Sequence, residues 1–502
     1  MKPTFFRYAV LVCCLLLNTV LVSAQKIHNK PRVVITTDGE VDDMDSFIRL
    51  LLYSNELNIV GLVYSSSEFH YAGDGKGTPF TSAMPFAKKY GTRTNLRWLG
   101  TTWMQSFIDR YATVYPNLRK HDANYPSPRR LKSLVRIGNI DFESEMDHDT
   151  EGSDFIKKLL LDADPAPLFF PVWGGTNTVA RALKSIEDQY KGTPQWEAIQ
   201  KKVSAKATLY IILDQDQTYQ KYLSANWPDL TILLNRSMFW CFAYLWDKTV
   251  PKPYLSYLDG PWHKEHIKFG HGALASSYFL WGDGQKLAND SDHTQGDTAE
   301  ALKNNMKKYA FISEGDSPSF LYLLNTGLRN LENPGYGGWG ARFERSKQNP
   351  HLWVDATAPA DYNGFTKKAD AHFSQTRWIE ALQNDFAARA DWCVKPFSQA
   401  NHPPQATLAG RQDISAKPGA AVRLTGLAKD PDGNAVTFRW WQYAEAGTCS
   451  EKVSIQNPGK ATATFTVPAN ARKDETIHLV LEVTDNGSPA LTRYRRVVVT
   501  VL

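Results

Sequence analysis

Residues 33–43 read Val-Val-Ile-Thr-Thr-Asp-Gly-Glu-Val-Asp-Asp, and this stretch decides the fold class. Its β-branched start predicts a strand over Arg32–Thr37. Residues 43–54 then place apolar side chains at helical spacing, and a second β-rich run follows at Asn58–Tyr64. A strand, a helix and another strand in this order indicate the start of a mostly parallel sheet.

The same alternation continues to about residue 389, with further strands predicted at 167–172, 207–213 and 230–234. We therefore predict an α/β domain over residues 25–395, with a mostly parallel sheet flanked by helices. Two long polar segments rich in glycine and proline, 115–152 and 255–298, are predicted to be functional loops rather than framework.

The composition changes near the C-terminus. Residues 396–404 have the composition of a linker, and helical periodicity is absent beyond them. Alternating runs separated by turns such as Asp-Pro-Asp-Gly at 430–433 predict a small immunoglobulin-like β-sandwich over residues 405–502. The aromatic run at 438–443 is expected to pack in a core or a domain interface, the alternative being a carbohydrate platform.

Residues 1–24 have the basic start, apolar middle and small-residue end of a cleaved signal peptide, which predicts a secreted or periplasmic protein without a membrane span. Without Lys2 and Arg7 the 57 basic and 52 acidic side chains become 55 and 52, a formal charge of +3. This near balance disfavours a nucleic-acid polymer as partner. The remaining Cys241, Cys393 and Cys449 allow at most one disulfide and have no metal-type spacing.

Three aspartates surround the first predicted strand–helix junction. Asp38 follows the strand, and Asp42 and Asp43 lie just before the helix, at the edge where α/β sheets bind ligands. Two carboxylates about 4 Å apart repel by roughly 4 kcal/mol at an effective dielectric near 20. A bound cation removes this repulsion, and oxygen ligands favour Ca²⁺ or Mg²⁺. The alternative is a solvated loop in which Asp43 caps the helix.

The run at 33–43 resembles the signature of nucleoside hydrolases, in which a strand leads to an aspartate, three residues and an aspartate pair. The resemblance implies a nucleoside-hydrolase fold with a bound calcium ion. It further implies that Asp38 binds calcium and acts as the general base, that Asp42 holds sugar hydroxyls, and that Asp43 binds calcium.

Two downstream segments extend the resemblance in the family's order. Residues 173–177, Trp-Gly-Gly-Thr-Asn, are similar to a family turn whose threonine gives a carbonyl to calcium, which implies this role for Thr176. Residues 313–318, Ser-Glu-Gly-Asp-Ser-Pro, precede an apolar helix and imply that Asp316 is the last calcium ligand. Taken alone, Thr176 and Asp316 would each more often be a helix N-cap than a ligand.

Other positions of the chain depart from the family or match it loosely. Gly39 and Glu40 replace a Pro-Gly pair, and Gly315 stands where many members have a histidine near the leaving base. The resemblance places Glu68, or its neighbour Ser67, at a sugar-contacting position. It also places Asp214 and Asp216 where the family uses a glutamate and an asparagine, so all three acids are predicted to bind substrate.

A closer resemblance is to a secreted bacterial subfamily described as nucleoside-hydrolase-like and cellulose-binding, which carries a C-terminal β domain. Its segments match here at 214–216, 270–272, 314–320 and 335–342. In the last of these, Trp339 is predicted to stack on a sugar and Arg342 to contact a hydroxyl, the alternative being that Trp339 packs beneath the loop. His271 is a candidate proton donor, with a structural role as the alternative.

These features predict a secreted, calcium-dependent glycoside hydrolase that cleaves an N- or O-glycosidic bond, with a furanosyl group as the expected substrate and Asp38 activating the water. The partner is then a carbohydrate or an extracellular nucleoside. The alternative function is non-catalytic binding of a cellulose-like glycan on the same scaffold. The sequence leaves the leaving-group acid and the oligomeric state open.

Overall fold

The computed structural model describes residues 30–290 and 293–502. Residues Pro31–Leu502 form one compact unit. The predicted signal peptide at 1–24 lies outside the described residues. Within the described part of the chain, no helix is long and apolar enough to cross a membrane.

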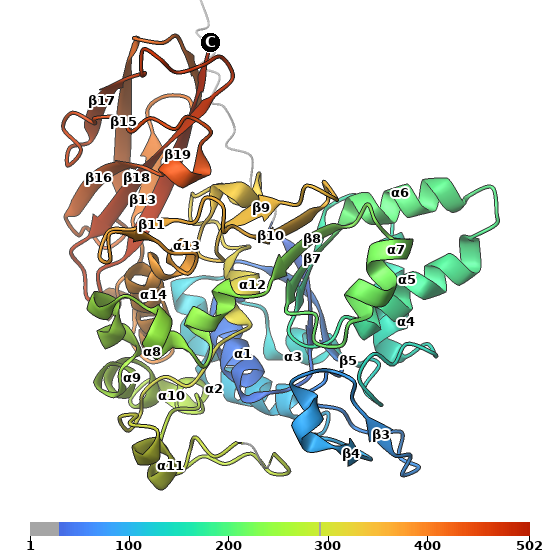
Figure 1. Ribbon diagram of the computed structural model, residues 1–502. Coiled ribbons are helices and arrows are strands. Elements are labelled where there is room, and N and C mark those ends of the chain that lie inside the picture. The colour runs from blue at the N-terminus through green and yellow to red at the C-terminus, as the bar shows by residue number, and fades with distance from the viewer. Residues whose placement is uncertain (1–29, 291–292) are drawn as a thin grey trace, which may run out of the picture. The chain divides into compact units, whose positions relative to one another are not determined.

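An eight-stranded sheet organises the larger part of the chain, in the order β5-β2-β1-β6-β7-β8-β10-β9 (Figure 1). All neighbours pair in parallel except β9 and β10, which are antiparallel. In chain order the strands are β1 (Arg32–Thr37), β2 (Asn58–Tyr64), β5 (Val135–Ile137), β6 (Leu168–Val172), β7 (Ala207–Ile212), β8 (Thr231–Asn235), β9 (Phe343–Arg345) and β10 (Leu352–Asp355). The predicted mostly parallel sheet is thus confirmed.

Helices cover both faces of this sheet, so its central strands are buried on both sides (Figure 1). On β1, Val33 and Ile35 belong to one hydrophobic cluster while Val34 belongs to the other, as the alternation of a strand requires. The first face is covered by α1 (Val41–Tyr53), α2 (Trp103–His121), α12 (Ser317–Leu321) and α14 (Ile379–Trp392). The second is covered by α4 (Glu151–Leu161), α5 (Asn177–Tyr190) and α6 (Trp196–Lys206).

One of the two predicted functional loops contains several framework elements. The segment 115–152 contains the end of α2, the short helix α3 (Pro128–Lys132) and β5, which pairs with β2 at the sheet edge. The prediction failed because charged residues dominate the exposed faces of these short elements and mask their periodicity. The segment 255–298 consists of short helical turns, among them α9 (Gly260–His263) and α10 (Gly272–Ala275).

The C-terminal residues form the predicted β-sandwich, in which two sheets enclose a separate hydrophobic cluster. One sheet has the order β13-β15-β17 and the other β14-β19-β18-β16. The strands are β13 (Gln405–Leu408), β14 (Asp413–Ala416), β15 (Ala421–Lys429), β16 (Val436–Gln442), β17 (Thr462–Thr466), β18 (Thr476–Asp485) and β19 (Thr492–Val501).

The sandwich shares a buried interface with the larger part, at the segment after α12 and at the residue before α14. Arg496 is fully buried and donates from Nε to the carbonyl of Leu328 at 2.7 Å and from Nη2 to that of Gly337 at 3.1 Å. The Trp441 ring packs on Trp378 with centroids 6.0 Å apart. The aromatic run of β16 therefore serves core and interface, as expected. The division into domains at 25–395 and 405–502 stays a prediction.

Candidate functional site

The predicted aspartates gather at the carboxyl end of β1. Asp38 follows the strand, Asp42 and Asp43 lie in the first turn of α1, and Asp316 arrives at the start of α12. All four side chains are buried, with exposures of 2%, 7%, 1% and 2%. One carboxylate oxygen from each of Asp42, Asp43 and Asp316 lies within 4.8 Å of the others. Residues far apart in sequence thus converge on one acidic group.

Hydrogen bonds hold these carboxylates without satisfying them. Thr37 Oγ1 donates to Asp43 and Ser67 Oγ donates to Asp38, while Ser313 Oγ donates to Asp42 at 3.2 Å. Asp43 also accepts the backbone N–H of Glu40 at 3.1 Å, so it caps α1 in addition to joining the cluster. Asp38 Oδ1 and Asp42 Oδ1 are buried with no hydrogen-bond partner.

The electrostatics of the acidic cluster show that it lacks a compensating positive charge from any residue of 30–290 or 293–502. Burial, and then the neighbouring Asp38, raise the pKa of Asp42 to about 6. The pKa values of Asp43 and Asp316 are also raised well above the usual range, first by burial and then by neighbouring carboxylates. A divalent cation would remove both the repulsion and the unmet hydrogen-bonding capacity, and Asp316 makes no cap hydrogen bond that would compete. The buried acidic groups fit a metal ion.

Two glycines allow the loops to approach this closely. A Cβ at Gly174 would lie 2.9 Å from Asp38 Cβ, and one at Gly315 would lie 2.8 Å from Asp42 Oδ2. A histidine cannot occupy position 315 without displacing Asp42. The glycine at position 315, where many family members have a histidine, therefore suits the close packing against Asp42.

The acidic group opens onto a pocket of about 640 Å³ whose lining includes Asp42 and Asp316, with Glu40 at one side. Asp38 lies deeper and is not part of the lining. The aromatic lining residues are Phe69, Phe86, Tyr90, Phe239, Trp240 and Tyr244. Apolar rings beside acceptor-rich carboxylates suit the C–H face and the hydroxyls of a sugar.

Sequence reasoning missed these rings and the pocket residue Gln215. Trp240 and Phe239 lie in the apolar run Met238–Phe242, which resembles ordinary core, and their rings pack with centroids 4.5 Å apart. Phe86 is 57% exposed and packs on Phe69 across a loop. The sequence held no signal for Phe86, because a single surface aromatic is ordinary and Phe86 is far from Asp38 along the chain.

Thr176 lies fully buried at the N-terminus of α5. Its hydroxyl contacts Asp216 Oδ1 at 3.3 Å, and its carbonyl accepts the N–H of Ala180 at 2.9 Å as the helix begins. A carbonyl oxygen has two lone pairs, so one remains for a cation. The structure is compatible with the predicted role of Thr176 without testing it.

The three acids predicted to bind substrate each accept hydrogen bonds from within the protein. Asp216 is fully buried and accepts from Thr218 and from the N–H of Asn177 at 3.0 Å. Asp214 accepts the N–H groups of Tyr219 and Gln220 at 3.2 and 3.0 Å. Glu68 accepts the N–H of Ala87 at 3.2 Å and so holds the Phe86 loop. None of the three is in the pocket lining.

His271 is also remote from the pocket lining. It precedes α10, and its Nε2 lies 3.2 Å from Asp391 Oδ1 on α14, with only 8% of the residue exposed. This position is the one expected if His271 has a structural role, which was the alternative to its role as a proton donor. An imidazole can pack among helices and still pair with one carboxylate, as it does here.

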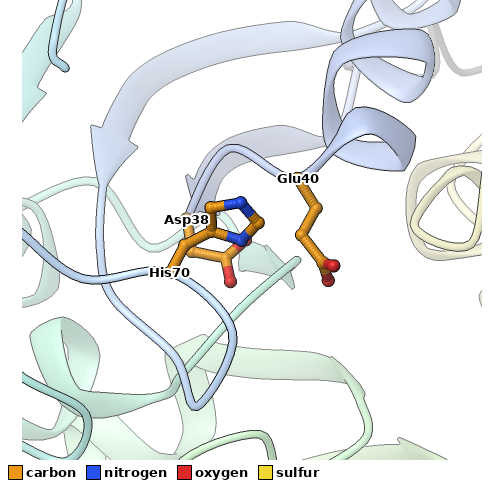
Figure 2. Close-up of side chains that lie close together, drawn as sticks. All are labelled: Asp38, Glu40 and His70. Atoms are coloured by element: carbon orange, nitrogen blue, oxygen red, sulfur yellow. The ribbon is translucent and has the colours of Figure 1, made fainter. Parts of the chain in front are cut away.

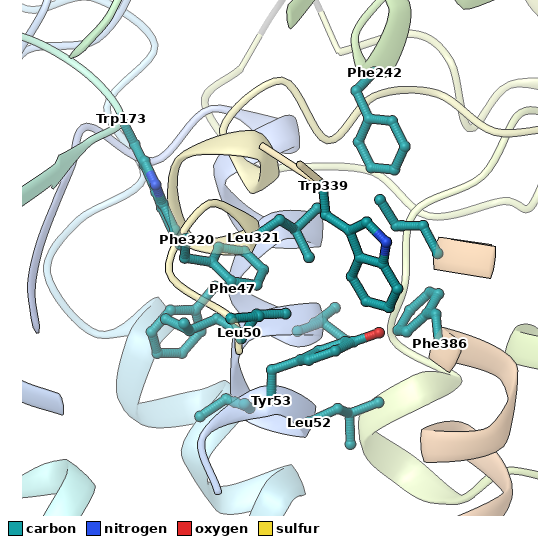
Figure 3. Close-up of a cluster of buried hydrophobic side chains, with 14 of the residues drawn as sticks. Phe47, Leu50, Leu52, Tyr53, Trp173, Phe242, Phe320, Leu321, Trp339 and Phe386 are labelled. Atoms are coloured by element: carbon teal, nitrogen blue, oxygen red, sulfur yellow. The ribbon is translucent and has the colours of Figure 1, made fainter. Parts of the chain in front are cut away.

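The glycine-rich loop 335–342 turns into the protein rather than toward the pocket. Trp339 is 1% exposed and packs among Tyr53, Leu321 and Phe386 (Figure 3). Arg342 Nε donates to Asp361 Oδ1 at 2.7 Å, and Tyr443 of the sandwich donates to the other oxygen at 2.6 Å. Trp339 is thus packed in the core and Arg342 is paired with a carboxylate, and neither lines the pocket. Their predicted sugar contacts stay predictions.

Comparisons with known proteins agree with this architecture. Residues 32–343 match the family described as cellulose-binding Sde182, nucleoside hydrolase-like domain. Residues 421–501 match the C-terminal domain of cellulose-binding protein Sde0182. No functionally curated protein is significantly similar in sequence.

A solved structure covers nearly the whole chain. It is a nucleoside hydrolase-related hypothetical protein from Saccharophagus degradans, associated with carbohydrate metabolism, which is similar at 27% identity over 94% of this chain and 100% of that one, with a TM-score of 0.69. A plant nucleoside hydrolase aligns over 73% of this chain and 100% of its own at 11% identity and a TM-score of 0.35, too distant to guide residue roles.

Proposed function

Because the chain belongs to the cellulose-binding Sde182 family with a nucleoside hydrolase-like domain, we propose that it is a secreted, calcium-dependent glycoside hydrolase. Its substrate class is a furanosyl glycan or glycoside with an N- or O-glycosidic bond. The observation that carries the proposal is the position of the acidic cluster: Asp42 and Asp316 face both the buried aspartates and the aromatic pocket.

In this proposal, different side chains bind the sugar and activate the water. Asp42 and Asp316 at the pocket wall accept hydrogen bonds from sugar hydroxyls, and the pocket rings exclude water from the other face. Asp38 keeps Oδ1 without a partner while Ser67 fixes its other oxygen, so it is oriented to accept a proton from an attacking water. Calcium, when bound by Asp38, Asp43, Thr176 and Asp316, would hold hydroxyls and lower the pKa of that water.

Non-catalytic glycan binding is the second candidate, and one observation favours it. Gly315 stands where the resemblance expects a histidine, and the predicted donor His271 lies beside Asp391, away from the pocket. Glu40 and His293 line the pocket, so this candidate requires that neither of them donates a proton to a leaving group. The pocket would then bind sugars without cleaving them. The two candidates share the pocket and the cation, so turnover alone separates them.

The test is a screen of nucleosides, aryl furanosides and cello-oligosaccharides with the parent protein and with Asp38→Asn. The substitution keeps the shape but removes the charge that accepts the proton, so turnover should fall by about 10²-fold or more while sugar binding persists. Calcium content is measured in both proteins, because loss of the ion would imitate loss of the base. Full activity in calcium-replete Asp38→Asn would exclude the mechanism, and binding without any turnover in the parent would favour the second candidate.

A further inference from the structure

A second group of ligating side chains lies beside the acidic cluster and has no part in the proposed reaction except through Asp38. Asp38, Glu40 and His70 each offer one ligand atom, and these atoms all lie within 4.8 Å of one another. Figure 2 shows the three side chains together, with the His70 ring directly beside the Asp38 carboxylate and Glu40 extending from the turn before α1. The set differs from the first group because it contains an imidazole.

His70 is the side chain whose surroundings need an explanation. It lies in the loop after β2 with none of its surface exposed, and neither ring nitrogen has a hydrogen-bond partner among the residues that the structure describes. Buried polar atoms in native proteins almost always have a partner, so an unmet imidazole aimed at two carboxylates points to a missing ligand.

Asp290 completes the surroundings of this ring. Its Oδ2 lies 3.5 Å from His70 Nε2, longer than an ordinary hydrogen bond, and its Oδ1 accepts from Arg97 Nε at 2.7 Å. Histidines that bind metals usually have a carboxylate beside the nitrogen that does not face the metal. With Nε2 beside Asp290, the other ring nitrogen, Nδ1, is left for a cation.

The charge balance supports a second cation. Five buried or half-buried carboxylates share this edge, namely those of Asp38, Glu40, Asp42, Asp43 and Asp316. Among the described residues, Arg97 forms an ion pair with this set, through Glu40 at 3.3 Å, and it also pairs with Asp290. One divalent cation and one guanidinium leave net negative charge in a low-dielectric site.

We propose that Asp38, Glu40 and His70 form a second cation site, selective for a first-row transition dication of the Zn²⁺ or Mn²⁺ type and distinct from the calcium site. Imidazole nitrogen favours such ions, whereas calcium takes oxygen ligands. Asp38 can serve both sites, because a carboxylate has about four lone-pair positions and Ser67 occupies one. The proposal concerns metal content and holds whether or not the protein cleaves glycosides.

The experiment uses the full chain, stripped of metal and then saturated with calcium. Mn²⁺ is titrated in, free Mn²⁺ is counted by EPR, and the bound ion is examined by pulsed EPR for coupling to ¹⁴N. We expect one Mn²⁺ per chain in addition to calcium, with a nitrogen coupling. His70→Gln should weaken Mn²⁺ binding by about 10- to 100-fold or more and abolish the coupling, while calcium content is unchanged.

Two matched variants separate the sites. Asp316→Asn should reduce calcium binding and retain the nitrogen coupling of bound Mn²⁺. His148→Gln removes an exposed histidine paired with Glu145 and should change neither ion, which excludes adventitious surface binding. If His70→Gln does not fold, Glu40→Gln keeps the ring and should still lower Mn²⁺ affinity.

Three outcomes would overturn the proposal. They are displacement of calcium by Mn²⁺ one for one, bound Mn²⁺ without nitrogen coupling in the parent protein, and a coupling that persists in His70→Gln. Absence of glycosidase activity would bear on the proposed function alone, because none of these readouts is a rate.

Discussion

Two regions match family segments in sequence, yet they occupy different environments. One is the acidic edge formed by Asp38, Asp42, Asp43 and Asp316, and the other is the glycine-rich loop 335–342. The acidic edge lies beside the pocket, while Trp339 of the loop is in the core and Arg342 is paired with Asp361. Buried carboxylates without partners are costly, so their convergence marks a ligand. An aromatic ring is stabilised by burial anywhere, so its presence in a motif does not locate a site.

The difference between the two regions is tested most directly by truncating one tryptophan in the core and one in the pocket. Trp339→Ala should lower the free energy of unfolding by about 3–5 kcal/mol, because it removes a fully buried indole from a packed core. Chemical denaturation monitors the change. The matched control Trp240→Ala removes a half-buried pocket ring and should cost clearly less stability. Loss of sugar binding in a stable Trp339→Ala protein would show that the loop 335–342 contributes to the sugar site.

Removal of calcium tests the acidic edge itself. Calcium at one hundred times its dissociation constant should stabilise the native state by about 2.7 kcal/mol, and chelation should lower the melting temperature accordingly. Asp316→Asn should lose most of this response, whereas Asp361→Asn, at the interface, should keep it despite lower stability. An unchanged melt in excess chelator, with no metal found by elemental analysis, contradicts the cation site.

A smaller effect is expected on ligand affinity at the pocket. Trp240→Ala should weaken sugar binding by about 0.5–1.5 kcal/mol, because a stacking face is lost while the carboxylates remain. Isothermal titration with the best glycan or glycoside from the screen measures it. An unaltered affinity would place the sugar away from the Met238–Phe242 turn.

The smallest effect concerns pH at the interface with the sandwich. Burial alone would raise the pKa of Asp385, but Arg493 and Arg389 hold it below its usual range. A depressed folded-state pKa contributes stability above the unfolded value of about 3.9 and loses it as the pH falls further. The difference in melting temperature between the parent and Asp385→Asn should therefore narrow below about pH 4. A constant difference across that range would show that Asp385 is not stabilised as a carboxylate.

Much of the architecture was predictable because local periodicity encodes it. The strand over Arg32–Thr37, the helix that follows and the alternation of β15 to β19 were all expected, since each buries a regular face. The short edge strand β5 and the helix α2 were not, because charged residues interrupt their patterns and only pairing with β2 or packing on α1 fixes them.

At the site, the sequence determined which residues carry charge and where a strand ends, and this grouped Asp38, Asp42 and Asp43; the family resemblance of residues 313–318 added Asp316. Only the tertiary structure decided what surrounds them. It brought Phe86, Trp240 and His70 to this edge from separate loops, and it turned Trp339, Arg342 and His271 away into the core. The physical reason is that ionised groups must be solvated or paired wherever they lie, whereas aromatic rings and neutral imidazoles are stable in several surroundings, so packing alone selects among them.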